Sequence, residues 1–351
     1  MEKFVFSGEN PGEAEAFVSS LGEKPYRSGQ IYDWIFKKGV FEFPAMSNLP
    51  GTFIPILKEK SVVLTLKQVE KRVSKKDGTR KYLFKLEDGN LIESVLLPAA
   101  ERVTVCVSTQ AGCPLGCVFC ATGLHGFMRN LKADEIVAQY LLMNRDFIRD
   151  TGRKVTNIVV MGMGEPFLNF RAVEKALKIF SSCWGAGISE RKITVSTSGI
   201  ITGIQRFSNL NAKYKLSISL HSPYDDKRKQ LIPVNKKYSL KKVLYAVERY
   251  IENTGMIVTF QYLMIRGIND TGNDALELAR ILKNIKCNVN LIIYNRIKGL
   301  PFRRPLETSI DKFINILESK GIFVKRRRSM GEEIDSGCGQ LRSRKMCVKS
   351  Q

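Results

Sequence analysis

The sequence predicts an α/β protein built around an incomplete barrel of parallel strands, preceded by a small helical domain and a β-hairpin. The chain has 351 residues, which exceeds one typical small domain. Beyond residue 90, short apolar runs alternate with longer amphipathic segments, a pattern typical of parallel strands joined by right-handed crossover helices. Six or seven such units are fewer than the eight of a closed barrel, and we expect the chemistry at the carboxyl ends of the strands.

Residues 1–90 are predicted to form a separate N-terminal domain. Its first half carries apolar side chains at near-helical spacing, interrupted by prolines and glycines, which indicates short helices. Its second half predicts a hairpin with strands at residues 62–73 and 81–86, joined by a turn at Lys76-Asp77-Gly78. The second domain is then expected to span residues 91–351.

The strands and helices of this second domain follow from the hydrophobic pattern. After a first strand at residues 91–97, strands are expected at residues 103–107, 157–161, 192–196, 215–220, 257–263, 289–294 and 322–325. Helices between them are expected at residues 133–147, 171–180, 240–252, 274–282 and 310–318.

The composition favours a polyanionic partner. The chain has 56 Lys and Arg against 34 Asp and Glu, a net charge of +22. Residues 1–90 carry 15 basic and 12 acidic side chains, so most of the excess lies beyond them. No apolar run reaches the length of a membrane span and no signal-peptide pattern opens the chain, so we expect a cytoplasmic protein that binds RNA or DNA. The densest basic stretches are residues 227–242, 296–304, 325–328 and 342–345.

Three of the eight cysteines, Cys113, Cys117 and Cys120, have the spacing C-x3-C-x2-C on a glycine-bearing loop. In an unexported chain, such crowding indicates metal or redox chemistry more than disulfides. Three thiolates at this spacing can hold three irons of a four-iron cluster and leave the fourth iron open to a ligand. The alternative is a structural zinc site formed by the three cysteines and His125.

Two further segments add to this pattern. Residues 161–166, Met-Gly-Met-Gly-Glu-Pro, follow a predicted strand and offer a carboxylate on a tight glycine turn. The turn has Phe167 where a dinucleotide-binding fingerprint needs its third glycine, so a nicotinamide site is excluded. Near the carboxyl end, Cys338 lies between Gly337 and Gly339, which would let a flexible segment carry the thiol to another site.

These residues resemble a known family. The cysteine spacing, with Phe119 before Cys120, resembles the radical S-adenosylmethionine superfamily. Together with residues 161–166, 196–199 and 331–341, the chain resembles the RlmN/Cfr family of RNA adenine methyltransferases over nearly its whole length. The resemblance implies a partial (βα)6-type radical SAM barrel with a small N-terminal accessory domain that takes part in RNA recognition.

The resemblance also implies the cofactors and the residues that bind them. Cys113, Cys117 and Cys120 would bind a [4Fe-4S] cluster, whose open iron would chelate S-adenosyl-L-methionine. The remaining contacts to S-adenosylmethionine would come from residues at the ends of predicted strands, namely Gly164, Glu165, Ser196, Ser219, Leu220, His221 and Asn295. A one-electron reductant such as flavodoxin or ferredoxin would supply the electron that reduces the cluster.

Three catalytic residues carry over in the same way. Cys338 matches the cysteine that first accepts a methyl group from one S-adenosylmethionine. A second S-adenosylmethionine gives the radical that activates this methyl group, which then adds to adenine. Glu93 matches the carboxylate that removes the ring proton, and Cys106 matches the thiol that attacks the Cys338 sulfur, forming a disulfide and releasing the RNA. From the residues alone, Cys106 would be a core cysteine and Glu93 a strand-edge carboxylate.

The family makes two products, 2-methyladenosine in the RlmN type and 8-methyladenosine in the Cfr type. Pro166 directly after Glu165 matches the RlmN type, whereas Ser336-Gly337 departs from the usual Ala-Ala before the methyl cysteine. The family acts on the peptidyl-transferase region of 23S ribosomal RNA, and some members also act on the tRNA adenosine beside the anticodon. A non-catalytic, zinc-stabilised RNA-binding protein is the alternative from another class.

Overall fold

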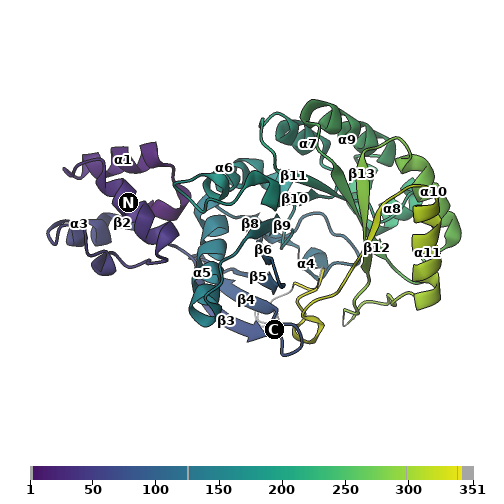
Figure 1. The fold of residues 1–351 in the computed structure, drawn as a ribbon, viewed down its shortest axis with the longest axis horizontal. Helices are drawn as coiled ribbons and strands as arrows, with labels where there is room; N and C mark the ends of the chain where they lie inside the picture. Colours follow the sequence, from purple (N-terminus) through teal and green to yellow (C-terminus); the bar gives the residue numbers. More distant parts are fainter. Residues whose placement is uncertain (1–2, 125, 298, 338, 342–351) are drawn as a thin grey trace.

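The computed structural model describes residues 3–124, 126–297, 299–337 and 339–341. Along the chain it has a helical N-terminal domain, an antiparallel hairpin, and an open barrel of alternating strands and helices (Figure 1). The predicted fold class is confirmed. No described helix is long and apolar enough to span a membrane.

The N-terminal domain is a cluster of short helices that packs against the barrel. Its elements are, in order, β1 (Phe4–Val5), α1 (Pro11–Ser20), α2 (Arg27–Tyr32), α3 (Phe53–Lys60) and β2 (Ser61–Val62). Thr65 donates to Asp134 of helix α5 (Ala133–Thr151) over 2.6 Å, and Lys175 of helix α6 (Phe170–Ser181) pairs with Glu13 over 3.1 Å. The first strand of the predicted hairpin begins at Lys67 rather than at residue 62, because β2 pairs with β1 instead.

Ten strands form one continuous sheet in the order β14-β13-β12-β11-β10-β9-β6-β5-β4-β3. The seven strands from β6 to β14 are parallel, and β5, β4 and β3 extend the sheet in antiparallel fashion beside β6. The strands are β3 (Lys67–Val73), β4 (Arg80–Lys85), β5 (Leu91–Pro98), β6 (Val103–Cys106), β9 (Asn157–Val160), β10 (Ile193–Thr197), β11 (Lys215–Ser219), β12 (Val258–Met264), β13 (Cys287–Ile293) and β14 (Val324–Arg327). A second small sheet pairs β7 (Gln110–Gly112) with β8 (Phe127–Asn130).

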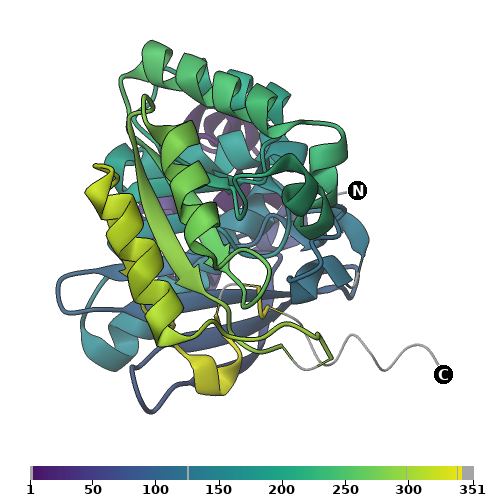
Figure 2. The same cartoon turned by 90° about the vertical axis from the view of Figure 1, so that its right-hand side faces the viewer.

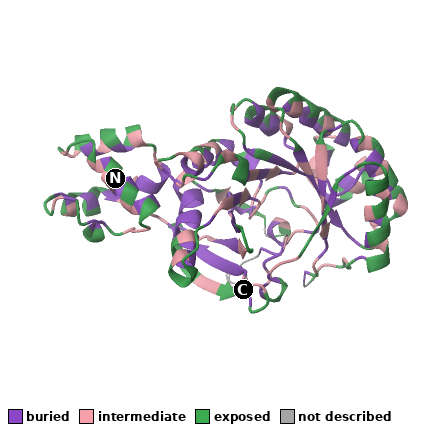
Figure 3. Ribbon diagram, viewed as in Figure 1, coloured by how far each residue is buried: buried purple, intermediate pink, exposed green. Residues whose placement is uncertain are grey.

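Helices follow the parallel strands and cover the outer side of the barrel, with their exposed faces toward solvent (Figures 2 and 3). They are α5 (Ala133–Thr151), α6 (Phe170–Ser181), α7 (Ile201–Ser208), α9 (Leu240–Thr254), α10 (Gly272–Leu282) and α11 (Glu307–Ser319). The short α4 (Ala121–Leu124) instead follows the loop of residues 113–120, and α8 (Asp225–Leu231) lies at the carboxyl ends of the strands. The five predicted helices are confirmed. Helices α4, α7 and α8 were not predicted, because eight residues or fewer give too short a periodic pattern.

The two faces of the parallel sheet differ in chemistry. The outer face is formed by apolar side chains that are at most 1 % exposed, including Ile158, Val160, Val195, Leu216, Ile218 and Phe260. The strand register places a polar row on the inner face, formed by Thr194, Ser196, Ser217, Ser219, Gln261 and Asn290. Parallel strands are usually apolar on both faces, so a polar inner face indicates that it receives a ligand.

The hairpin is fixed to helix α5 by a partly buried ionic cluster. Lys71 of β3 pairs with Asp146 over 3.1 Å, and Arg80 of β4 pairs with Asp150 over 2.7 Å. The Tyr82 hydroxyl donates to Asp146 over 2.6 Å. The hairpin therefore belongs to the same packed unit as the barrel sheet.

Glycines allow the segment after β9 to pack directly on the segment after β6. A Cβ atom at Gly162 would lie 2.5 Å from Ser108 Oγ and 2.8 Å from the Ser108 amide nitrogen. One at Gly164 would lie 2.6 Å from Gln110 Cβ, and the φ of Gly164 is +102°. Backbone hydrogen bonds of 2.8 to 3.2 Å join the two segments.

We expect Gly162→Ala to lower the free energy of unfolding by about 1–3 kcal/mol, since the added methyl group collides with backbone atoms that have no room to move. Gly29→Ala is the matched control. Gly29 lies on the exposed side of α2 with nothing within 4 Å of its Cβ position, so its variant should be as stable or slightly more stable. Urea denaturation of both variants measures the difference, and equal midpoints would contradict this account.

Candidate active site

The three clustered cysteines lie on the loop between β7 and α4, next to the carboxyl ends of the parallel strands. The loop is held by backbone hydrogen bonds from Cys113 to Gly126 over 2.9 Å, and from Val118 to Leu231 over 3.2 Å. All three side chains are partly exposed. Burial raises the pKa of Cys113 to about 12 and raises that of Cys117 well above its usual value, and the nearby Glu165 carboxylate acts in the same direction.

This donor set fits an iron-sulfur cluster. In the part of the chain that the structure describes, no three His, Cys, Asp or Glu side chains converge as ligands around a bound metal ion would. Three thiols within eight residues of one loop are nevertheless the ligand type and number that hold three irons of a four-iron cluster. His125, the fourth ligand of the alternative zinc site, lies outside the described residues.

Glu165 is the buried carboxylate of the glycine turn after β9. It is 2 % exposed, and its two oxygens accept the amide protons of Phe167 over 3.1 Å and of Ser198 over 2.8 Å. Its own amide donates to the Gln110 side chain over 2.8 Å. Burial raises the pKa of Glu165, and the two amide bonds oppose that shift. The Glu165 side chain is thus fixed in the turn after β9, where the sequence predicts a contact to S-adenosylmethionine.

Arg228 is a structural element of the site that the sequence did not reveal. Its side chain is fully buried, and its guanidinium donates to three carbonyl oxygens at the ends of strands: Ser198 over 2.7 Å, Ser219 over 3.1 Å and Leu220 over 3.1 Å. Burial lowers its pKa to about 10. Arg228 therefore fixes the backbone at the predicted cofactor contacts Ser219 and Leu220. Its position within a basic stretch of the sequence did not predict this role.

The predicted contacts on β11 and β13 are well ordered by their own partners. His221 has a φ of +57°, and its Nδ1 accepts the Leu263 amide proton over 2.9 Å. Burial lowers the pKa of His221 to about 3, so the imidazole is neutral. Its ring packs edge-on against Phe119 of the cysteine loop at 4.9 Å. Asn295 accepts the Ser329 hydroxyl proton over 2.9 Å, which places it beside the chain that follows β14.

The carboxyl-terminal segment lies between the hairpin and the cysteine loop. At one end the Gly331 amide donates to Asp77 of the hairpin turn over 2.8 Å. At the other end Gly339 accepts the Ala121 amide proton over 2.7 Å, and Leu341 accepts the Thr122 hydroxyl proton over 2.8 Å. Cys338 itself lies outside the described residues. Its described neighbours are nevertheless held against the loop that carries the predicted cluster ligands.

Glu93 and Cys106 share the inner face of the sheet. Cys106 lies opposite Val95 in the antiparallel pair of β5 and β6, and Glu93 is two residues from Val95, so both side chains point to the same side. Glu93 is 4 % exposed, and Lys81 lies 3.0 Å from its Oε2. The register also continues from Cys106 to the polar row of β10 and β11, which includes Ser196 and Ser219.

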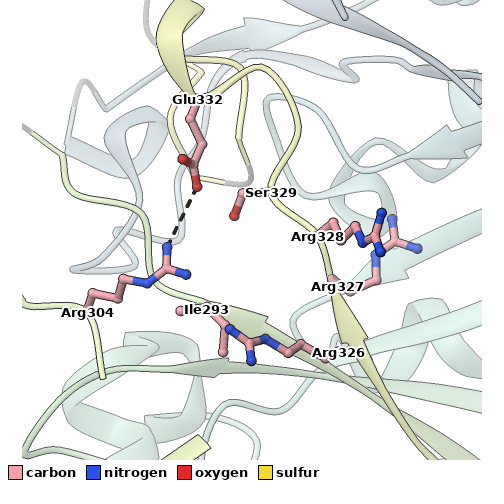
Figure 4. A pocket seen from close by; sticks show the side chains of 7 residues that line it. All are labelled: Ile293, Arg304, Arg326, Arg327, Arg328, Ser329 and Glu332. Carbon is pink, nitrogen blue, oxygen red and sulfur yellow. Dashed lines mark ion pairs between the residues drawn. The ribbon is translucent and has the colours of Figure 1, made fainter. Parts of the chain in front are cut away.

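An arginine-rich pocket of about 580 Å³ opens beside the carboxyl-terminal segment (Figure 4). Its lining residues are Ile293, Arg304, Arg326, Arg327, Arg328, Ser329 and Glu332. Arg304 lies 3.8 Å from Glu332, and Arg326 lies 2.7 Å from Glu307. Because Ser329 also binds Asn295, the pocket adjoins the predicted cofactor contacts.

The fold and the site together define the radical S-adenosylmethionine class of enzymes. The family model of the radical SAM superfamily matches residues 107–280, from the end of β6 through most of α10. The model of the ribosomal RNA large subunit methyltransferase N-terminal domain matches residues 8–63.

Similar proteins identify the family within this class. A probable dual-specificity RNA methyltransferase RlmN of Thermotoga maritima is 45 % identical over 95 % of this chain and 96 % of its own. The RlmN protein of Alkaliphilus oremlandii is 42 % identical over 97 % of this chain and 98 % of its own. The crystal structure of a radical SAM methyltransferase from Sphaerobacter thermophilus superposes with a TM-score of 0.94 at 41 % identity, over 97 % of this chain and 99 % of that one. The chain belongs to the RlmN family of radical SAM RNA methyltransferases.

We expect Cys117→Ala to lose nearly all bound iron while it unfolds at the same temperature as the wild type, since Cys117 lies on a loop outside the main sheet. Cys183→Ala, which removes an exposed thiol far along the chain, is the control and should keep its iron. Iron and sulfide assays after anaerobic purification give the result. Full iron content in Cys117→Ala, or a wild type that binds zinc alone, would contradict the cluster assignment.

Proposed function

We propose that this chain methylates carbon 2 of adenosine in RNA, at adenosine 2503 of 23S ribosomal RNA and at the tRNA adenosine beside the anticodon. The relatives' shared description as dual-specificity RNA methyltransferases supports two RNA substrates. Pro166, which directly follows Glu165, supports carbon 2 over carbon 8, because a proline at this position matches the RlmN type. A cytoplasmic location with flavodoxin or ferredoxin as reductant completes the proposal.

The observation that carries this proposal is the shared inner face of Glu93 and Cys106, with the Cys338 segment held beside the cysteine loop. Carbon 2 of adenine is electron-poor and cannot attack a sulfonium methyl group. A thiolate such as that of Cys338 can, so methyl transfer to a protein thiol is the feasible first step. A [4Fe-4S] cluster bound by the three cysteines would supply the single electron needed to activate the methyl group.

The remaining residues act on the RNA-linked state of Cys338. Glu93 accepts the proton of carbon 2, for which its position on the inner face suits it. Cys106 then attacks the Cys338 sulfur and forms a disulfide with it. The carbon–sulfur bond breaks, its electron pair leaves with the methylene carbon, and that carbon takes up a proton to become the methyl group of the released base. The unpaired electron left on the ring by radical addition would return to the cluster that the three cysteines would hold. Gly164, Glu165, Ser196, Ser219, Leu220, His221 and Asn295 bind S-adenosylmethionine in this proposal.

We expect Cys106→Ala to accumulate a covalent protein–RNA adduct, because no second thiol can attack the Cys338 sulfur. Cys338→Ala and the double variant should form no adduct, since nothing then links the protein to the base. Denaturing gels after incubation with RNA, reductant and S-adenosylmethionine show the adduct as a slow-migrating band. Cys287→Ala, which removes another partly buried thiol, should turn over normally. Absence of the band in Cys106→Ala would mean that Cys106 only packs against the core.

The arginine-rich pocket is the surface that we assign to the RNA backbone. Two basic stretches, residues 296–304 and 325–328, meet in it, and Ser329 joins it to Asn295. Arginine side chains match phosphate oxygens in geometry and charge. Two cations of the stretch at residues 227–242 already have partners inside the protein, because Arg228 is buried and Lys227 pairs with the buried Asp274 over 2.7 Å.

We expect the double change Arg327→Glu and Arg328→Glu to weaken RNA binding and to reduce the salt dependence of binding by about one unit of slope per lost phosphate contact. Arg191→Glu with Lys192→Glu makes the same charge change at the opposite end of the strands, where both residues are exposed. It should bind RNA almost as the wild type does. Fluorescence anisotropy over a salt series measures both slopes, and equal slopes for the two double variants would place the RNA elsewhere.

A further inference from the structure

Lys81 is a buried cation between the proposed base and the segment that carries the proposed methyl acceptor. The residue is 8 % exposed. Its Nζ lies 3.0 Å from Glu93 Oε2 and donates to the carbonyl oxygen of Asp335 over 3.0 Å. Removing an ammonium group from water is costly unless its donors find partners. These two contacts therefore define what Lys81 does.

The strand register explains why this lysine points into the site. Lys81 lies opposite Val95 in the pair of β4 and β5, so it shares the inner face with Glu93 and Cys106. Its neighbours Arg80 and Tyr82 point the other way, where they bind acidic side chains of helix α5. The alternation of the strand thus separates a structural cation from a cation in the site.

We propose that Lys81 is a positioning residue that keeps the Glu93 carboxylate ionised and aimed into the site. A positive charge within about 4 Å favours the ionised form of a carboxylate. Glu93 must be ionised to accept the proton of carbon 2, while the electron pair of that C–H bond stays with the ring. The contact to Asp335, three residues before Cys338, holds the segment beside the same carboxylate. This inference rests on the proposed role of Glu93.

The test is Lys81→Met, which keeps the length and apolar stem of the side chain and removes its charge. We expect the variant to bind iron and S-adenosylmethionine normally and to place a methyl group on Cys338, detected by peptide mass spectrometry. Turnover should fall by about 10-fold or more, because proton removal is impaired. The protein–RNA adduct should build up in single-turnover reactions, as it should in Glu93→Gln.

Two further variants make the result specific. Lys81→Arg keeps the charge and several donors, so it should restore most of the turnover. Lys85→Met removes an exposed lysine from the same face of β4, four residues away, and should leave turnover unchanged. Rescue by arginine together with an unaffected Lys85→Met separates positioning from a general loss of positive charge.

The outcomes separate this inference from the proposed function. Wild-type turnover in Lys81→Met beside an inactive Glu93→Gln would overturn the role of Lys81 alone. So would a Lys81→Met enzyme that binds S-adenosylmethionine but leaves Cys338 unmethylated, since Lys81 would then serve only the carboxyl-terminal segment. Full turnover in Glu93→Gln, or a wild type that never methylates Cys338, would overturn the proposed function and this inference with it.

Discussion

The predicted site depends on one close contact, between the segment that follows β6 and the segment that follows β9. Backbone hydrogen bonds of 2.8 to 3.2 Å join residues 107–110 to residues 162–163, and neither Gly162 nor Gly164 leaves room for a Cβ atom. The segment after β6 leads into the cysteine loop, and the segment after β9 leads to Glu165. Their contact therefore fixes the predicted cluster ligands relative to the carboxylate that would bind the same cofactor molecule. Gly162 and Gly164 are therefore needed for the packing of this turn, and that packing sets the position of Glu165.

The two faces of the sheet have different roles. The outer face of the sheet is apolar and packs against the helices, so it contributes most of the stability of the fold, whereas the polar inner face is suited to bind a ligand. Because β5 and β4 continue the same sheet beyond β6, the inner face extends past the parallel strands and includes Glu93 and Lys81. The hairpin thus enlarges the site rather than standing apart as an accessory, and its turn also contacts the segment before Cys338.

The sequence predicted the fold well where a pattern is local. Strand and helix positions beyond residue 90 agree with the structure to within a few residues, because hydrophobic periodicity reports burial directly. The attachment of the hairpin to the barrel sheet was not predicted, since strand pairing depends on partners far along the chain. The assignment of Cys113, Cys117 and Cys120 as cluster ligands and of Glu165 as a cofactor contact comes from spacing and resemblance, and it stays a prediction. Arg228 and Lys81 were missed, because only the folded chain shows that these two cations of basic segments are buried.

That distinction changes how the positive charge of the chain is understood. A net charge of +22 invites the view that each basic stretch meets RNA. In the folded protein Arg228 binds strand-end carbonyl groups, Arg80 binds helix α5, and Lys81 faces Glu93. These three cations therefore have partners within the protein and are not available to bind RNA. The arginines around the pocket beside Asn295 differ because they line an opening next to the predicted cofactor contacts. Phosphate groups that bind there would bring the nucleotide toward the inner face, where the proposed thiols and carboxylate lie. Position relative to that face, rather than the local density of lysine and arginine, therefore decides which basic residues can guide the RNA.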